Sequence, residues 1–260
     1  MKERIDVLLV LRKLVESRTK AQWLIRNGLV IVDGKVIKKP GKKIDDSLKI
    51  LLINNYPYVG RGGLKLEGAL KEFSVDVEGK VCMDIGASVG GFTDCLLKNG
   101  AERVYAIDKA TNLLHPSLIN KRMRKNVIPM LGTDARELIN INEDIDICTI
   151  DITFASLKTI LPNIRRLLKK NGDIIALVKP IFETEFEGNR KFIIIQNAKQ
   201  LSKILTGLTD WCIKNKFYIA NLIKSPLLGK EGSIEFFIHL KMKDLGLKLD
   251  LNKIIKNVIK

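Results

Sequence analysis

The sequence predicts an α/β protein with a mostly parallel sheet of seven strands, preceded by a small α+β domain. Short apolar runs alternate with helical patterns from residue 64 onward, which is typical of a parallel sheet with right-handed crossovers. A glycine-rich turn follows the run Val81 to Ile85, as in nucleotide-binding β-loop-α units. Before Ile53, by contrast, two short helical patterns precede a tight β-hairpin.

Composition narrows the class of partner. The chain has 260 residues and a formal net charge of +16, and the basic excess is concentrated at its two ends. This favours a polyanionic partner such as nucleic acid, with an anionic membrane surface as the competing explanation. The four cysteines are far apart, so no zinc site or disulfide framework is predicted. With no signal-peptide pattern and no spanning apolar run, the expected compartment is the cytoplasm.

In the N-terminal part, the spacing of apolar residues predicts a helix over residues 2–13 and a second over Arg18 to Asn27. Ser17 is the expected N-cap of the second helix, and Gly28 is expected at its C′ position. The second helix presents Arg18, Lys20 and Arg26 on one face. Strands are expected over residues 29–32, 35–37 and 48–53, with a hairpin turn at Asp33-Gly34. Such a basic, compact module suits RNA, although a solvated helix face is the alternative.

Residues 64–240 supply the larger domain. Its elements are expected as a helix over 64–73, strands over 81–85, 103–107, 127–131, 146–150, 174–178, 218–223 and 234–240, and helices over 157–169 and 197–214. A loop, SPLLGKEGS, joins the last two strands, so the final strand is expected to be antiparallel. That arrangement is usual in S-adenosylmethionine-dependent methyltransferases. The tail, residues 241–260, reads as a basic amphipathic helix that packs on the sheet or touches RNA.

The glycine-rich turn indicates the ligand. It reads D-x-G-x-x-x-G-G from Asp84 rather than the dinucleotide pattern G-x-G-x-x-G. A carboxylate there would repel phosphate, but it suits the cationic amino-acid end of S-adenosylmethionine. Asp108, which ends the next strand, can accept both hydroxyls of a ribose. A glycine-rich turn that only packs tightly is the alternative.

Four charged residues stand where a substrate could reach them. They lie at expected strand or helix ends, and ionisable side chains that close apolar strands, as three of them do, are costly unless they are paired. The set is therefore a candidate for chemistry or for a structural ion-pair cluster. They are Lys65 in RGGLKL, Asp151 in IDITF, Lys179 in LVKP and Glu235 in GSIEFF.

Taken together, these motifs resemble the TlyA family, the "hemolysin A" proteins that are 2′-O-methyltransferases of ribosomal RNA, and more distantly the FtsJ-type methyltransferases. The specific segments are RGGLKLE, DIGASxGGFTDCLL, VYAID, IDxxFxSL, LVKPxFE and SPLLGKEGSIEF. The first fifty residues, RIDVLLV to KKPGKKI, resemble the alpha-L RNA-binding fold. The resemblance implies a Rossmann-like class I S-adenosylmethionine methyltransferase fold. It divides the chain into an RNA-binding domain (1–55), a linker (56–63), an FtsJ-like domain (64–242) and a basic C-terminal helix or tail (243–260).

The resemblance also assigns residues. The family's catalytic tetrad falls on Lys65, Asp151, Lys179 and Glu235, its cofactor residues on Asp84, Gly86, Ser88, Gly90, Asp108 and, at the adenine edge, Asp134, and its RNA contacts on Arg18, Lys20, Arg26 and Lys35. Lys179 is then the base that deprotonates a ribose 2′-hydroxyl, and Asp151 positions it. Lys65 and Glu235 orient the ribose, and no metal is required. The implied partner is ribosomal RNA in its subunits, with a cytidine as target and a monomeric enzyme.

The chain departs from the family at several positions. Residues 109–114 and 189–196 lack the family's glycine-rich segments, Val89 replaces a hydroxyl residue, and Ile181 replaces a glutamine. These changes keep open a second reading, a catalytically weakened RNA-binding or ribosome-assembly factor. A third is a membrane-active hemolysin, for which only the amphipathic tail offers support.

Overall fold

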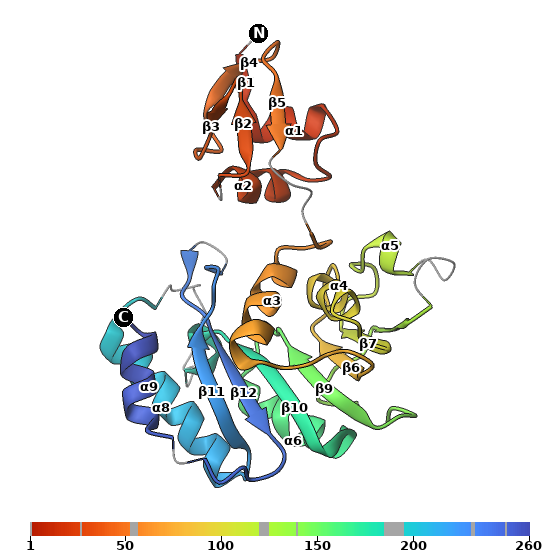
Figure 1. Ribbon diagram of the computed structural model, residues 1–260, viewed down its shortest axis with the longest axis vertical. Helices are drawn as coiled ribbons and strands as arrows, with labels where there is room; N and C mark the ends of the chain where they lie inside the picture. Colours follow the sequence, from red (N-terminus) through yellow and green to blue (C-terminus); the bar gives the residue numbers. More distant parts are fainter. Residues whose placement is uncertain are drawn as a thin grey trace. The chain divides into compact units, whose positions relative to one another are not determined.

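A computed structural model describes residues 2–26, 28–52, 57–119, 125–138, 140–184, 195–229, 232–247 and 249–260. The chain forms two compact units, residues 1–61 and 62–260 (Figure 1). Most of the family departure at 189–196 lies outside the described residues, as do Asn27 and Ile53, with which two expected elements end.

The first unit is a small α+β module. Its elements are β1 (Lys2–Arg4), α1 (Ile5–Leu11), α2 (Arg18–Arg26), β2 (Val30–Val32), β3 (Lys35–Val36), β4 (Lys43–Asp45) and β5 (Ile50–Leu52). β2 lies between β3 and β5, and β1 pairs with β4, all antiparallel. Asp33 and Gly34 have φ values of 48° and 78°, as a tight hairpin turn requires. The buried Leu9, Leu24 and Ile25 form part of its core.

One expectation for this unit was wrong. The helix expected over residues 2–13 begins only at Ile5, because Lys2 to Arg4 form strand β1. That strand pairs with β4, a segment whose own sequence shows no strand pattern. A pairing with residues about forty positions away decides the conformation here, and a local apolar pattern carries no information about it.

The second unit is built on a seven-stranded sheet in the order β11-β12-β10-β9-β6-β7-β8. Its strands are β6 (Val81–Ile85), β7 (Arg103–Asp108), β8 (Val127–Leu131), β9 (Ile145–Ile150), β10 (Leu168–Val178), β11 (Tyr218–Lys224) and β12 (Phe236–Lys241). β12 is antiparallel to both of its neighbours, whereas β10, β9, β6, β7 and β8 are parallel. This confirms the mostly parallel sheet with an antiparallel last strand.

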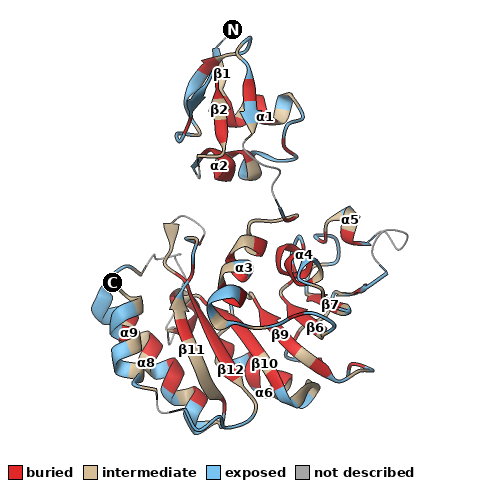
Figure 2. Ribbon diagram, viewed as in Figure 1, coloured by how far each residue is buried: buried red, intermediate tan, exposed pale blue. Residues whose placement is uncertain are grey.

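Helices cover both faces of this sheet. They are α3 (Gly62–Phe73), α4 (Gly91–Lys98), α5 (Pro116–Ile119), α6 (Leu157–Ile164), α7 (Pro180–Glu183), α8 (Ala198–Lys214) and α9 (Leu251–Val258). Side chains alternate along β12: Phe236 and Ile238 join the core shared with α6 and α8, whereas Phe237 stacks on Phe92 of α4 and His239 on Phe73 of α3. The sheet is therefore buried on both faces, as Figure 2 shows.

Two helices are shorter than expected. The helix expected over residues 157–169 ends at Ile164, and after a 3₁₀ turn strand β10 already begins at Leu168. In the tail, the helix covers only Leu251–Val258. It packs on α8 and β11 with Ile255 buried, so the apolar face expected of this segment lies against the protein. Among the described residues, no helix is long and apolar enough to span a membrane.

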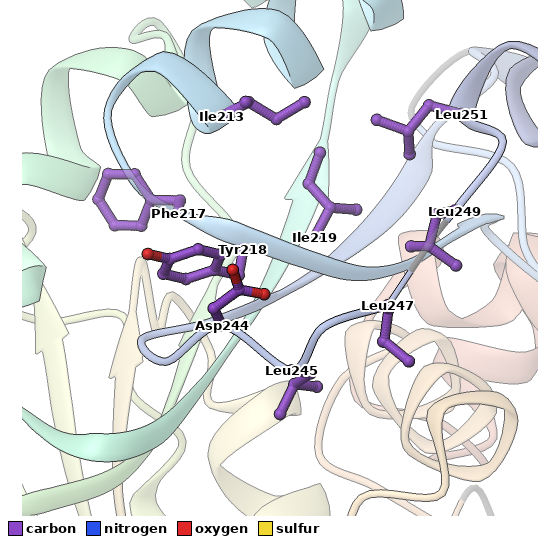
Figure 3. Close-up of a pocket in the computed structure, with 9 residues that line it drawn as sticks. All are labelled: Ile213, Phe217, Tyr218, Ile219, Asp244, Leu245, Leu247, Leu249 and Leu251. Carbon is purple, nitrogen blue, oxygen red and sulfur yellow. The ribbon is translucent and has the colours of Figure 1, made fainter.

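A pocket of about 200 Å³ lies between the end of α8, the start of β11 and the segment before α9 (Figure 3). Ile213, Tyr218 and Leu247 are among its lining residues. Since β11 runs parallel to β10, this pocket lies at the amino ends of the strands. The residues expected to act in chemistry lie at the opposite edge of the sheet.

Candidate active site

The register of the sheet brings the candidate catalytic residues to one edge. Val178 at the end of β10 pairs with Phe236 at the start of the antiparallel β12. The next residue outward on each strand, Lys179 and Glu235, therefore leaves the sheet at the same place. β9 is parallel to β10 and ends beside it, so Asp151 emerges at this edge as well.

The four residues form two ion pairs. Nζ of Lys179 contacts Oδ1 of Asp151, and their side chains are 14% and 26% exposed. Nζ of Lys65, from the first turn of α3, lies 2.5 Å from Oε2 of Glu235, and both side chains are only 5% exposed. The structure therefore brings together the residues that the sequence motifs group. One pair is accessible from solvent and the other is almost completely buried.

The glycine-rich loop touches the same edge. Gly86 and Gly90 have φ values of 82° and 92°, and Gly90 is the N-cap of α4. A Cβ atom at Gly86 would collide with the carbonyl oxygen of Asp151, whose N–H donates to the carbonyl of Ile85 at 2.9 Å. Glycine is required at 86 both by the backbone conformation and by this close approach. The loop and the Asp151–Lys179 pair are thus fixed against each other.

Asp108, at the end of β7, is hydrogen-bonded to the glycine-rich loop at Ser88. Its carboxylate accepts hydrogen bonds from the backbone N–H groups of Ser88 at 2.7 Å and Ala110 at 2.8 Å. Ser88 itself is exposed and has a φ of 51°. A carboxylate has about four lone-pair sites, so Asp108 retains acceptors for two further donors, which is the requirement for binding a ribose diol.

Asp134 is more heavily engaged. Its oxygens accept from Arg136, at 2.6 Å for the shortest contact, and from Nζ of Lys109 at 3.0 Å. The hydrogen bonds from Arg136 hold the pKa of this carboxyl well below its usual range. Lys109 is 68% exposed and belongs to the segment that departs from the family. A donor such as an adenine amino group would therefore have to replace one of these contacts.

Asp84, which was expected to face the cationic end of the cofactor, is buried in the structure. Its side chain has no exposed surface, and its two oxygens accept from Thr93 Oγ1 at 2.6 Å and Thr149 Oγ1 at 3.0 Å. Burial raises the pKa of Asp84 to about 7. The carboxylate thus faces the protein interior beneath the loop, instead of presenting itself to a cationic ligand. The two threonines that satisfy it carry no signal in the sequence, although Thr93 lies inside the segment DIGASxGGFTDCLL.

Two further features of this edge were missed by sequence reasoning. Phe154, three residues after Asp151, is 74% exposed and has a φ of 65°, which is strained for an aromatic residue. Its ring lies 5.5 Å from that of Phe182. Glu183 is buried and accepts hydrogen bonds from Ser156 and Leu157. Phe154 and Glu183 lie inside the motifs IDxxFxSL and LVKPxFE, which could have pointed to both.

In the first unit, one of the expected RNA contacts, Arg18, is bound to a buried carboxylate. Asp6 has no exposed surface and accepts from Arg4, Arg18 and Gln22 at 2.8 to 3.1 Å. The hydrogen bond from Arg4 is the largest cause that holds the pKa of Asp6 well below its usual range. Lys20 pairs with Glu16 at 3.3 Å, whereas Arg26 and Lys35 are exposed. The hydrogen bonds from Arg4 to Asp6 could not be expected from the sequence, because the apolar pattern of residues 2–13 predicts a helix where Arg4 lies in strand β1.

Comparisons with known families match both units. The family described as FtsJ-like methyltransferase matches residues 58–242, and the family described as S4 domain matches residues 3–50.

Relatives match most of this chain. YqxC of Bacillus subtilis is 42% identical over 92% of this chain and 85% of its own length. Hemolysin A of Brachyspira hyodysenteriae is 37% identical over 91% and 98%. The 16S/23S rRNA (cytidine-2′-O)-methyltransferase TlyA of Mycobacterium tuberculosis is 33% identical over 92% and 89%.

Solved structures agree with the fold. A Streptococcus thermophilus protein superposes with a TM-score of 0.73 at 38% identity, covering 99% of this chain and 94% of its own. A SAM-dependent methyltransferase from Aquifex aeolicus gives 0.51 at 18% identity, over 71% and 95%.

Proposed function

Because the chain belongs to the FtsJ-like methyltransferase family and also carries an S4 domain, we propose that it transfers a methyl group from S-adenosylmethionine to a ribose 2′-hydroxyl of ribosomal RNA. The observation that carries this proposal is the common edge at which Lys179 contacts Asp151 and Lys65 contacts Glu235, directly beside the loop at Gly86. Methyl transfer to an alcohol requires a base and an oriented acceptor, and this edge supplies groups for both.

The residues of the loop fit the cofactor. Gly86 and Gly90 give the loop its left-handed turns, Ser88 is exposed, and Asp108 retains acceptor sites. In the proposal these residues and Asp134 hold S-adenosylmethionine, and Asp84 supports the loop from below. When bound, the cofactor supplies a methyl group on a positively charged sulfonium. Asp134 and Asp151 are already paired with cations, so Asp108 is the carboxylate here that best suits such a cation.

Lys179 is the proposed general base. Its amine would take the proton from the 2′-hydroxyl, and Asp151, in contact with Nζ, would fix the direction in which the amine points. A base must be neutral to accept the proton, so the proposal requires Lys179 to act as the free amine.

The remaining groups would present the nucleotide. Lys65 and Glu235 are fixed by their buried ion pair, and we assign them to orient the ribose. Phe154 lies beyond Asp151 with its ring exposed, where it can stack on the base of an unstacked nucleotide. Cytidine is the proposed target by analogy with the relative from Mycobacterium tuberculosis.

The S4 domain would dock structured RNA through Arg18, Lys20, Arg26 and Lys35, by charge and shape more than by sequence. Since ribosomal subunits are the proposed substrate, the proposal places the protein in the cytoplasm, acting as a monomer.

The test is to treat ribosomal subunits that lack this modification with the protein and S-adenosylmethionine, and to map 2′-O-methylated nucleotides by mass spectrometry. A single methylated ribose would support the proposal. Binding to subunits without any methylation would instead favour the assembly-factor reading, which the changed segment at 109–114 motivates. The packing of α9 on α8 and β11, with Ile255 buried, counts against the membrane-active interpretation.

A further inference from the structure

Glu183 links the two loops that carry the base and its carboxylate partner. It is the last residue of α7, four positions after Lys179, and is 8% exposed. Its Oε1 accepts from the backbone N–H of Leu157 at 2.8 Å, and its Oε2 accepts from Oγ of Ser156 at 2.6 Å. Ser156 is the N-cap of α6, five positions after Asp151.

Three contacts therefore join the same pair of loops in order. The Lys179–Asp151 pair lies nearest the strands, the rings of Phe154 and Phe182 follow at 5.5 Å, and Glu183 closes the far end. Lys179, Asp151 and Phe154 are partly or largely exposed, whereas Glu183 itself is buried. Buried hydrogen bonds to a charged group constrain geometry more strongly than exposed ones.

Glu183 is well placed to tie the loop after β10 to the start of α6. A carboxylate at the start of α6 interacts favourably with the helix N-terminus. Burial raises the pKa of the Glu183 carboxyl, and the bonds from Leu157 and Ser156 oppose that rise. Ser156 also accepts from the N–H of Lys158 at 3.1 Å, so its hydroxyl proton is directed to Glu183.

We propose that Glu183 is a positioning residue that holds the Lys179 amine against Asp151 by anchoring the loop after β10 to the N-terminus of α6. This inference rests on the proposed function for its catalytic consequence, but its geometric content is independent of that function. Glu183 does not touch substrate. It acts by fixing the direction of Lys179 and the strained backbone at Phe154.

The test measures the reactivity of Lys179 in the full-length protein. Acetylation of each lysine by acetic anhydride is followed by mass spectrometry between pH 7 and pH 11. Glu183→Ala is expected to increase labelling of Lys179 severalfold at a given pH, because the amine is released from Asp151. Glu183→Gln is expected to follow the wild type, since its amide can accept from Leu157 and donate to Ser156.

The matched control is Asp250→Ala, which removes another N-cap carboxylate, that of α9, away from this edge. Labelling of Lys179 should not change in it. If Glu183→Ala fails to fold, Ser156→Ala removes the same bond with a smaller change and should raise Lys179 labelling in the same direction. Wild-type labelling of Lys179 in both folded variants would overturn the proposal.

Methyl transfer gives the second measurement. Glu183→Ala should lower kcat by about tenfold to a hundredfold, as expected for a misdirected catalytic group, with KM for RNA unchanged. If the wild type transfers no methyl group but Glu183→Ala still changes the labelling of Lys179, the proposed function is refuted and the anchoring role of Glu183 is supported. Active wild type with unchanged labelling in the variants would refute the anchor alone.

Discussion

Nζ of Lys65 lies 2.5 Å from Oε2 of Glu235 in an almost fully buried ion pair that joins α3 to the start of β12. Removing one partner leaves the other charge buried and unpaired, which typically costs about 3 to 5 kcal/mol. Lys65→Met and Glu235→Gln are therefore each expected to lower the free energy of unfolding by that order of magnitude. Urea denaturation at neutral pH measures the loss.

The double variant Lys65→Met/Glu235→Leu separates stability from chemistry. Replacing a whole buried pair by apolar residues is often close to neutral for stability. It should restore much of the unfolding free energy lost in the single variants but should not restore methyl transfer. Recovery of activity together with stability would show that the pair is structural.

Asp84 makes stability depend on pH in a specific direction. Burial raises the pKa of its carboxyl from 3.8 to about 7, so between these values the folded state holds a proton that the unfolded state has released. The contribution of Asp84 to stability is therefore fully present at low pH and is lost as the pH rises through about 7. Asp84→Asn removes that loss, on the order of a few kcal/mol.

Unfolding free energies at pH 5 and pH 8 test this. The variant should gain stability relative to the wild type on going from pH 5 to pH 8. An equal difference between the two proteins at both pH values would mean that Asp84 is ionised in the folded protein throughout this range.

The proposed stacking of Phe154 on a nucleotide base can be tested by substitution. Its side chain is 74% exposed, so Phe154→Ala should change the midpoint of thermal unfolding very little. Loss of one stacked base costs about 1 to 3 kcal/mol, so the efficiency of RNA methylation should fall by about fivefold to 150-fold. Leu247→Ala, at an exposed apolar residue beside the pocket of Figure 3, is the matched control. Equal activity in both variants would exclude base stacking by Phe154.

The first unit is tested by the salt dependence of RNA binding. Arg26→Gln and Lys35→Gln should each weaken binding to ribosomal subunits and reduce the slope of log K against log salt by about one, because each of these exposed cations is expected to neutralise one phosphate. Arg166→Gln, an exposed arginine of the second unit, serves as the control. A slope unchanged by the first two variants would mean that these side chains do not meet phosphate.

Much of the fold could be predicted because local signals agree with the final structure. β6 and β8 occupy the residues expected for them, since each is an apolar run bounded by turn residues. β1 and β4 could not be predicted, because they are three-residue strands whose only support is each other. The helix over 157–169 was overestimated, since the apolar period continues through residues that enter β10.

The candidate site shows a similar division. Asp151, Lys179 and Glu235 stood out because charges at the ends of apolar strands are unusual, and Lys65 was singled out within the segment RGGLKLE. Their arrangement in two pairs, one buried and one accessible, depends on the register between β10 and β12. Burial of Asp84 beneath the loop likewise could not be inferred, since a strand buried on both faces reads as a continuous apolar run and gives no sign of whether a carboxylate near its end meets water.

The most direct measurement is transfer of labelled methyl from S-adenosylmethionine to unmodified ribosomal subunits by the wild type, Lys179→Ala and the control Lys256→Ala, an exposed lysine of α9. The proposed mechanism predicts label in rRNA with the wild type and the control, and a loss of at least about a hundredfold with Lys179→Ala, because a general base contributes about that much. Equal transfer by all three proteins would contradict Lys179 as the base. The absence of transfer by the wild type, with subunit binding retained, would contradict the enzymatic function itself.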